Sequence, residues 1–228
     1  MTRTLATTLV LAMTPVSDLR PQDAPSIELA FQGSFLGSGP FPESGSDWFA
    51  LVRTESGWDA AETSIEVAEL AEPICGDTAT RIAALDVGDP LFLFRGSPGF
   101  KAGPLNSVVD APRFFYPAES ESFQLDSGRY FGFQAYGSAT PRDEGIENYR
   151  IYLNREGRRQ LIAEFPRIGL DGPPHLVWAG DLDHDGEPDA LFDLARSYAG
   201  DLFVLFLSSP ASDEQLVARV AEFPVSGC

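Results

Sequence analysis

The chain has 228 residues, with 34 Asp or Glu against 16 Lys or Arg, so its formal net charge is −18. Nucleic-acid backbones and anionic membrane surfaces are bound through clustered positive charge, and this composition excludes both as partners. Hydrophobic residues make up 43% of the chain and aromatic residues 11%, which is enough for a packed core. The 21 Gly and 18 Pro interrupt the chain often, which favours many short strands over long helices.

The first 25 residues are predicted to be a signal peptide followed by a linker. A single charge, Arg3, precedes an apolar run over residues 5–13 and a small-residue stretch at 15–17, a pattern typical of a weak secretory signal. A disordered or buried N-terminus is the alternative. The run is too short for a mature membrane span, and no later segment is apolar for long enough. We therefore expect a soluble protein that is secreted or periplasmic.

Strand patterns follow along the rest of the chain. Before residue 115 they cover residues 27–31, 48–54, 64–70, 80–84 and 91–94. The composition of residues 64–72 also allows a helix. After residue 115 strand patterns cover residues 131–136, 149–153, 160–165, 202–207 and 216–223, and a turn at 154–157 joins the second and third into a hairpin. We predict a mostly-β fold, either one antiparallel sandwich or two small β domains over residues 26–115 and 116–228.

Acidic residues recur at alternate positions just before the last two strand patterns. Four of them occupy positions 1, 3, 5 and 9 of a D-x-D-x-D-G-x-x-D loop: Asp181, Asp183, Asp185 and Asp189. Alternate side chains of a tightly curved loop converge on one point, and Gly186 at position 6 can adopt the positive φ that such curvature needs. The backbone carbonyl of Glu187 at position 7 can add another oxygen. Six or seven hard oxygens suit Ca²⁺ better than Mg²⁺ or Zn²⁺.

A cation is expected in this loop because its acids would otherwise repel one another. Each pair held about 4–6 Å apart costs roughly 3–4 kcal/mol at an effective dielectric constant near 20. An open, solvated acidic turn without metal is the alternative, and His184 is not expected to be a ligand. An EF-hand is disfavoured because position 12 is Phe192 instead of Glu and because Pro188 would disrupt the start of a helix. The flanks are strand-like, which predicts a strand–calcium loop–strand hairpin.

The segment from residue 180 to residue 191 resembles the calcium loop of FG-GAP/VCBS-type repeats, which occur in integrin α-subunit propellers and many secreted bacterial proteins. The resemblance implies that the four aspartates bind through their side chains and that Glu187 binds through its carbonyl. It covers one short segment, and the rest of the chain carries no second copy. Because propellers need several copies, neither that architecture nor integrin-like adhesion is implied.

The two cysteines, Cys75 and Cys228, are predicted to form a disulfide, since an even count in an exported chain favours pairing. Such a bond would close most of the chain into one loop and is worth roughly 5 kcal/mol in the chain-entropy model. Unpaired thiols are the alternative. A catalytic thiolate is disfavoured because neither cysteine lies near a histidine in the sequence.

Motifs of the common hydrolases, metalloproteases and nucleotide-binding folds are absent from the sequence. Trp48, Trp58 and Tyr136 could form a sugar-binding platform, although aromatic residues at strand spacing are more often part of a core. We expect an exported acidic module with structural calcium that binds an unidentified protein or carbohydrate and has no catalytic residues. A secreted carbohydrate-active hydrolase with calcium as scaffold is the alternative, and a deep pocket with two carboxylates would favour it. A component of a larger periplasmic assembly is a third possibility.

Overall fold

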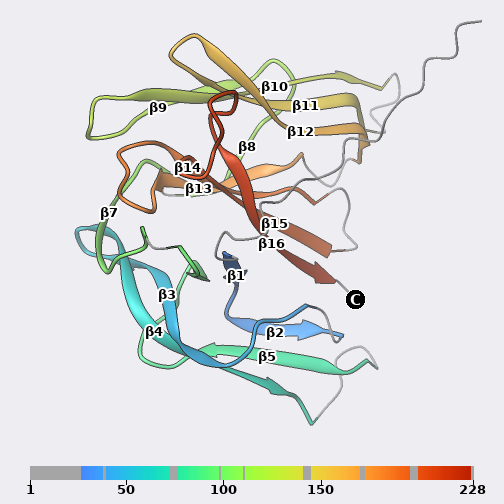
Figure 1. Cartoon of the computed structure of the whole chain (residues 1–228). Coiled ribbons are helices and arrows are strands. Elements are labelled where there is room, and N and C mark those ends of the chain that lie inside the picture. Colours follow the sequence, from blue (N-terminus) through green and yellow to red (C-terminus); the bar gives the residue numbers. More distant parts are fainter. Residues whose placement is uncertain are drawn as a thin grey trace, which may run out of the picture.

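The computed structural model describes residues 27–37, 40–71, 77–97, 99–109, 111–140, 145–169, 173–195 and 200–226 (Figure 1). The regular elements in these ranges are all β-strands in antiparallel pairs, which confirms the mostly-β prediction. They include no helix long and apolar enough to cross a membrane. The predicted signal peptide and both cysteines of the predicted disulfide lie outside the described residues.

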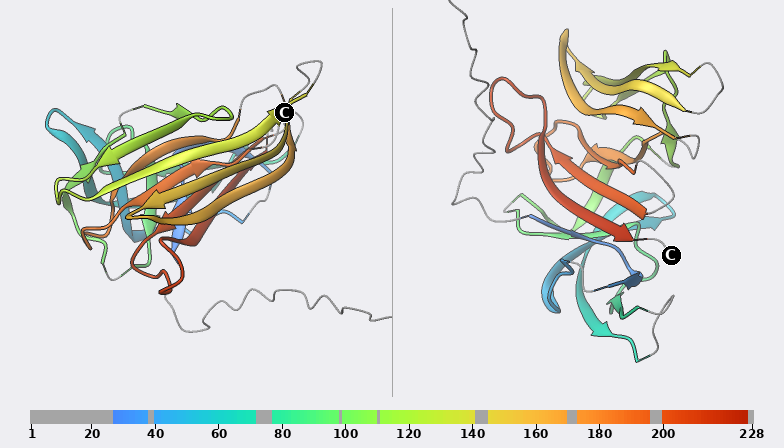
Figure 2. Two further views of the ribbon diagram at one scale, coloured as in Figure 1. Left: turned by 90° about the horizontal axis from the view of Figure 1, so that it is seen from above. Right: turned by 90° about the vertical axis from the view of Figure 1, so that its right-hand side faces the viewer.

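The strands form three stacked layers (Figures 1 and 2). The first layer contains β1 (Glu28–Ala30), β2 (Gly33–Leu36), β3 (Gly45–Thr54), β4 (Gly57–Glu69), β5 (Ala79–Ala84), β6 (Phe92–Arg95) and β7 (Gly103–Ser107). The middle layer contains β13 (His175–Asp181), β14 (Asp189–Asp193), β15 (Gly200–Leu207) and β16 (Ala218–Ser226), with the short β8 (Arg113–Phe114) beside β13. The third layer contains β9 (Ser120–Gln124), β10 (Tyr130–Ala139), β11 (Ile146–Arg155) and β12 (Arg158–Ile168).

The first two layers belong to one continuous sheet. Its strands follow the order β1-β6-β3-β4-β7-β13-β14-β15-β16, and β7 forms the link because it pairs with both β4 and β13. The third layer is a separate sheet in the order β12-β11-β10-β9. Strands from both sides of residue 115 thus share a sheet, and the domain boundary at that residue stays a prediction.

The core consists of two apolar clusters, one on each face of the middle layer. Along β15, Leu205 and Leu207 point into the cluster shared with the first layer, whereas Val204 and Phe206 point into the cluster shared with the third. Aromatic rings cross both interfaces, with centroids 6.0 Å apart for Phe92 and Trp178 and 5.0 Å apart for Phe133 and Phe192. Burial on both faces explains why β13, β14 and β15 contain continuous apolar runs, whereas β16 at the edge of the sheet alternates.

Residues 64–69 of the segment for which a helix was the alternative belong to a strand, β4. Its Ile65 is buried between the exposed or half-buried Ser64 and Glu66, and it pairs with β3 on one side and β5 on the other. Period-two burial and pairing on both sides outweigh the helical preference of Glu and Ala, because sheet packing overrides intrinsic propensity. The predicted hairpin is also confirmed, since β11 and β12 pair around a turn in which Glu156 and Gly157 have positive φ.

Candidate metal centre

The acidic loop connects β13 to β14 in a hairpin, as predicted. Gly180 pairs with Asp189 in antiparallel register, so the two strands meet where the loop begins and ends. Asp181 pairs in addition with Asn106 of β7, which fixes the first loop residue to the first layer. Gly186 has a φ of 82°, which confirms the positive φ predicted at position 6.

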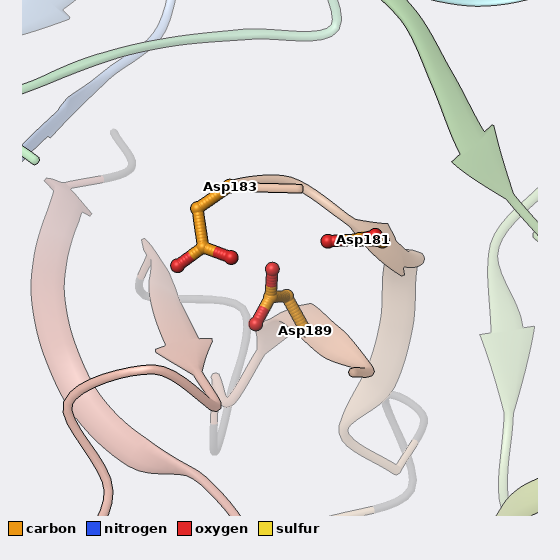
Figure 3. A group of neighbouring side chains, drawn as sticks. All are labelled: Asp181, Asp183 and Asp189. Atoms are coloured by element: carbon orange, nitrogen blue, oxygen red, sulfur yellow. The ribbon is translucent and has the colours of Figure 1, made fainter. Parts of the chain in front are cut away.

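Three of the five predicted ligand residues come together in the loop. Asp181, Asp183 and Asp189 each offer one carboxylate oxygen, and these oxygens all lie within 4.8 Å of one another. Figure 3 shows the three carboxylates directed toward a common centre, with Asp181 at the end of β13 and Asp189 at the start of β14. Asp189 is fully buried and Asp183 is only 6% exposed. This group could hold a metal ion.

Hydrogen bonds fix these carboxylates in place. The backbone N–H of Leu182 donates to Asp189 Oδ2 and that of Ser208 to Asp189 Oδ1, both over 2.8 Å. Asp181 Oδ2 accepts from the backbone N–H of Gly186 over 3.0 Å, and Asp183 Oδ2 accepts from the hydroxyl of Ser209. These bonds hold the carboxylates in the converging arrangement, and each carboxylate keeps lone pairs for a ligand bond.

Two oxygens of the group are buried without a hydrogen-bond partner. Asp181 Oδ1 and Asp183 Oδ1 are shielded from solvent and accept no bond from any described residue. Most buried polar atoms in proteins are satisfied, and leaving one unsatisfied costs about 1–3 kcal/mol. A bound cation would satisfy both oxygens at once, so the residues present fit a metal ion.

The pKa shifts of the three carboxyl groups also favour a bound cation. Burial raises the pKa of Asp189 well above its ordinary value, and the Asp183 carboxylate raises it further. Burial also raises the pKa values of Asp181 and Asp183, to which the negative charge of Asp185 adds. Burial and mutual repulsion thus both disfavour the ionised carboxylates, and a divalent cation would offset both effects.

The side chains of the other two predicted ligand residues, Asp185 and Glu187, have other partners. Asp185 is exposed and outside the group of three, and it accepts hydrogen bonds over 2.8 Å from the N–H of Glu187 and from the Ser208 hydroxyl. The Glu187 side chain forms ion pairs with Arg155 and, over 3.2 Å, with Arg129, both in the third layer. The predicted ligand roles of Asp185 and of the Glu187 carbonyl stay predictions.

Residues outside the loop that contact it were not recognised in the sequence. Ser208 and Ser209 follow β15, and the register in which Ala190 pairs with Phe206 brings them beside the acidic loop. The only sequence signal was their position directly after a buried strand. That signal becomes useful only once β15 is known to pair with β14, because a polar residue follows many strands.

The predicted aromatic platform is divided between core and surface. Trp48 and Trp58 are buried in the cluster between the first and middle layers, whereas Tyr136 is 38% exposed on the third layer. No family model matches the chain, no curated protein matches it, and no solved structure matches it. The case for its function therefore rests on the geometry of its own residues.

Proposed function

We propose that the loop of residues 181–189 binds Ca²⁺ and that this ion stabilises an exported β-sheet module that acts by binding a ligand. The observation that carries the proposal is the convergence of Asp181, Asp183 and Asp189 with two buried oxygens that lack a partner. The resemblance to FG-GAP/VCBS-type calcium loops supports the same ligand set.

Calcium is the cation that suits these ligands best. The donors of the converging group are all carboxylate oxygens, which are hard ligands, and among the described residues no imidazole joins them. Zinc prefers sulfur and nitrogen ligands, and magnesium demands a small octahedral shell in which it keeps several waters. A loop that offers several carboxylates and backbone carbonyls from an irregular backbone is typical of calcium sites.

The proposed role of the ion is structural because the loop joins elements of all three layers. Asp181 pairs with β7, Asp189 is held by Ser208 after β15, and Glu187 reaches Arg129 and Arg155 of the third layer. An ion bound within the loop would restrain all of these connections together. Export would place the protein where calcium is in the millimolar range used by extracellular calcium modules.

A binding module is favoured over a hydrolase by the character of the surface groove on the third layer. This groove has a volume of about 540 Å³ and is open to solvent. Its two acidic lining residues are both engaged in ion pairs, Glu121 with Arg113 and Glu156 with Arg129. A glycosidase needs two carboxyl groups available on either side of the scissile bond, so this groove is better suited to holding a ligand.

Thermal unfolding with and without calcium tests the metal proposal. With a dissociation constant of about 0.1 mM, 1 mM CaCl₂ adds about 1.4 kcal/mol of stability, which raises the melting temperature by roughly 3–6 °C. Asp183→Asn removes one charge while keeping the shape and the hydrogen bond to Ser209. We expect this variant to lose the calcium response without being less stable than the wild type in EDTA, because a buried repulsive charge is gone.

Asp86→Asn is the matched control because Asp86 is an exposed aspartate in a turn of the first layer. It should retain the full calcium response. Calcium-loaded wild-type protein that melts at the same temperature after EDTA treatment would contradict the proposal. A larger shift with Mg²⁺ or Zn²⁺ than with Ca²⁺ at equal concentration would contradict the choice of cation.

A further inference from the structure

The outward face of the third layer carries a groove whose residues have no role in the metal centre. Side chains alternate along β10, so Phe131 and Phe133 enter the core while Tyr130 and Gln134 face outward. We call this feature the outer groove. The lining residues that bear on ligand binding are Ser122, Tyr130, Gln134, Asn154 and Arg159.

Gly132 keeps the centre of the outer groove open. A Cβ atom at this position would lie 2.5 Å from the backbone oxygen of Glu121 on β9, so only glycine allows the two strands to approach this closely. No side chain therefore rises between Tyr130 and Gln134. The volume of about 540 Å³ lies within the range of about 300–1,000 Å³ that is common for small-molecule sites, so the groove has room for a short oligomer.

The outer groove carries unneutralised positive charge on a strongly acidic protein. The Arg159 guanidinium stacks on aromatic rings, 3.6 Å from the centroid of Tyr152 and 4.6 Å from that of Tyr136, and no described carboxylate forms an ion pair with it. Arg158, its neighbour on β12, faces inward instead, because it pairs with the inward-facing Arg155 and donates to the backbone carbonyls of Asp213 and Gln215 between β15 and β16. A ligand group that meets the Arg159 guanidinium is therefore expected to be anionic.

The remaining charges around the outer groove cancel. Arg155 pairs with Glu187, and Arg129 pairs with both Glu187 and Glu156. The Glu121 carboxylate lies 3.7 Å from Arg113. Arg159 is thus the local excess charge on the outward face, and its stacking on two rings holds its hydrogen-bond donors in a fixed plane.

The uncharged part of the outer groove suits a sugar ring. Tyr130 is 62% exposed and offers an aromatic ring to an apolar C–H face. Ser122, Gln134 and Asn154 add hydroxyl and amide groups that both donate and accept hydrogen bonds, as the hydroxyls of a sugar require. A long polyanion such as a nucleic acid would be repelled by the net charge of −18, whereas a short ligand with one acidic group meets only the local excess.

We propose that the outer groove binds an acidic saccharide, with the anionic group on Arg159 and a sugar ring on Tyr130. The anionic group is a carboxylate or a sulfate, which present the same kind of oxygen acceptor to the Arg159 guanidinium group. The proposal rests on the binding role proposed above and names its ligand class. It does not require calcium to be the ion in the loop.

Isothermal titration calorimetry in excess CaCl₂ tests this assignment with two matched probe pairs. Trigalacturonate is compared with its methyl ester, and lactose 3′-sulfate is compared with lactose. At least one acidic probe should bind at least about tenfold more tightly than its neutral partner, since a charged hydrogen bond is worth about 1.5–3 kcal/mol. Which acidic probe binds more tightly identifies the anionic group, and added NaCl should weaken its binding.

Variants locate the site. Arg159→Gln should weaken the acidic probe about tenfold or more, and Arg159→Lys should restore part of the loss because it keeps the charge but not the planar fork. Tyr130→Ala should weaken the acidic and the neutral probes alike. Arg219→Gln is the matched control because Arg219 lies on β16 outside the outer groove, and its binding should equal that of the wild type.

Equal affinity for acidic and neutral probes, unchanged binding by Arg159→Gln, or tighter binding of a single-stranded oligothymidylate would each overturn the proposal. The calcium-dependent rise in melting temperature is measured on every variant. A groove variant that keeps this rise but loses the saccharide has lost the groove site alone. Saccharide binding in a protein whose stability ignores calcium would leave the groove proposal standing and remove the metal proposal.

Discussion

Gly186 shows how a single residue shapes the metal centre. Its φ of 82° turns the loop so that its N–H donates to Asp181 Oδ2 over 3.0 Å. His184, two residues earlier, also has positive φ, at 60°, and its side chain is exposed. The loop thus has left-handed backbone on either side of Asp185, a conformation that glycine adopts freely and other residues adopt at a cost.

The substitution Gly186→Ala measures the free-energy cost of a left-handed backbone at this position. No atom lies within 4 Å of the position that its Cβ would occupy, so the added methyl group meets no steric conflict. We expect a loss of about 1 kcal/mol from the left-handed conformation, seen in chemical denaturation in EDTA. Gly88→Ala is the control, because Gly88 has equal space but no positive φ, and it should change stability little. Equal effects from both substitutions would show that conformation is not the cause.

At the scale of the element, β13 carries an ionisable residue at each end. Its last residue, Asp181, belongs to the metal centre, and its first residue, His175, lies against Phe114 with ring centroids 4.6 Å apart. His175 Nδ1 is 4.0 Å from Asp193 Oδ2. Burial lowers the pKa of His175, while the negative charges of Asp193 and Asp201 oppose this effect without cancelling it.

This shift predicts a pH dependence of stability. Because the folded-state pKa of His175 is below its ordinary value of about 6.5, the unfolded chain takes up the proton first as the pH falls. The contribution of His175 to stability is therefore fully present above about pH 6.5 and is lost below it. We expect His175→Gln to reduce the decline in unfolding free energy between pH 7 and pH 5, measured by urea denaturation in saturating calcium. Parallel profiles for the two proteins would contradict this assignment.

At the scale of the whole molecule, the acidic loop is a junction of the three layers. The Ser127 hydroxyl donates to the Gly186 carbonyl over 3.4 Å, and a Cβ on Gly99 would lie 3.1 Å from the Asp183 side chain. Together with Ser208 after β15, these contacts bring loops from each layer to one point. Order imposed on the acidic loop is therefore expected to spread to its neighbours.

Hydrogen exchange measures how far that order spreads. Adding calcium should slow amide exchange in the acidic loop and also around residues 126–129, 207–209 and 97–100, because local opening of these segments breaks contacts with the loop. The turn at residues 85–89 in the first layer has no contact with the loop among the described residues and should exchange equally fast in both states. Protection restricted to residues 181–189 would show that the ion acts only locally.

Local periodicity was sufficient for much of the fold and part of the site. Most strands, the hairpin of β11 and β12, the strand character on both sides of the acidic loop and the positive φ of Gly186 were all predicted, because each depends on residues close in sequence. The alternate spacing of Asp181 and Asp183 likewise indicated convergence, and Asp189 joins them because the hairpin returns there.

Other features were decided by contacts between distant segments. The apolar run of residues 202–207 predicted a strand, β15, but its place between two layers follows from contacts with distant segments. In the same way, Asp185 lies outside the converging group and is bonded by Ser208 after β15, and Arg159 lies over Tyr136 because β12 and β10 flank β11. Curvature and side-chain alternation are short-range properties of the chain, whereas strand order and layer contacts depend on which distant surfaces bury the most apolar area together.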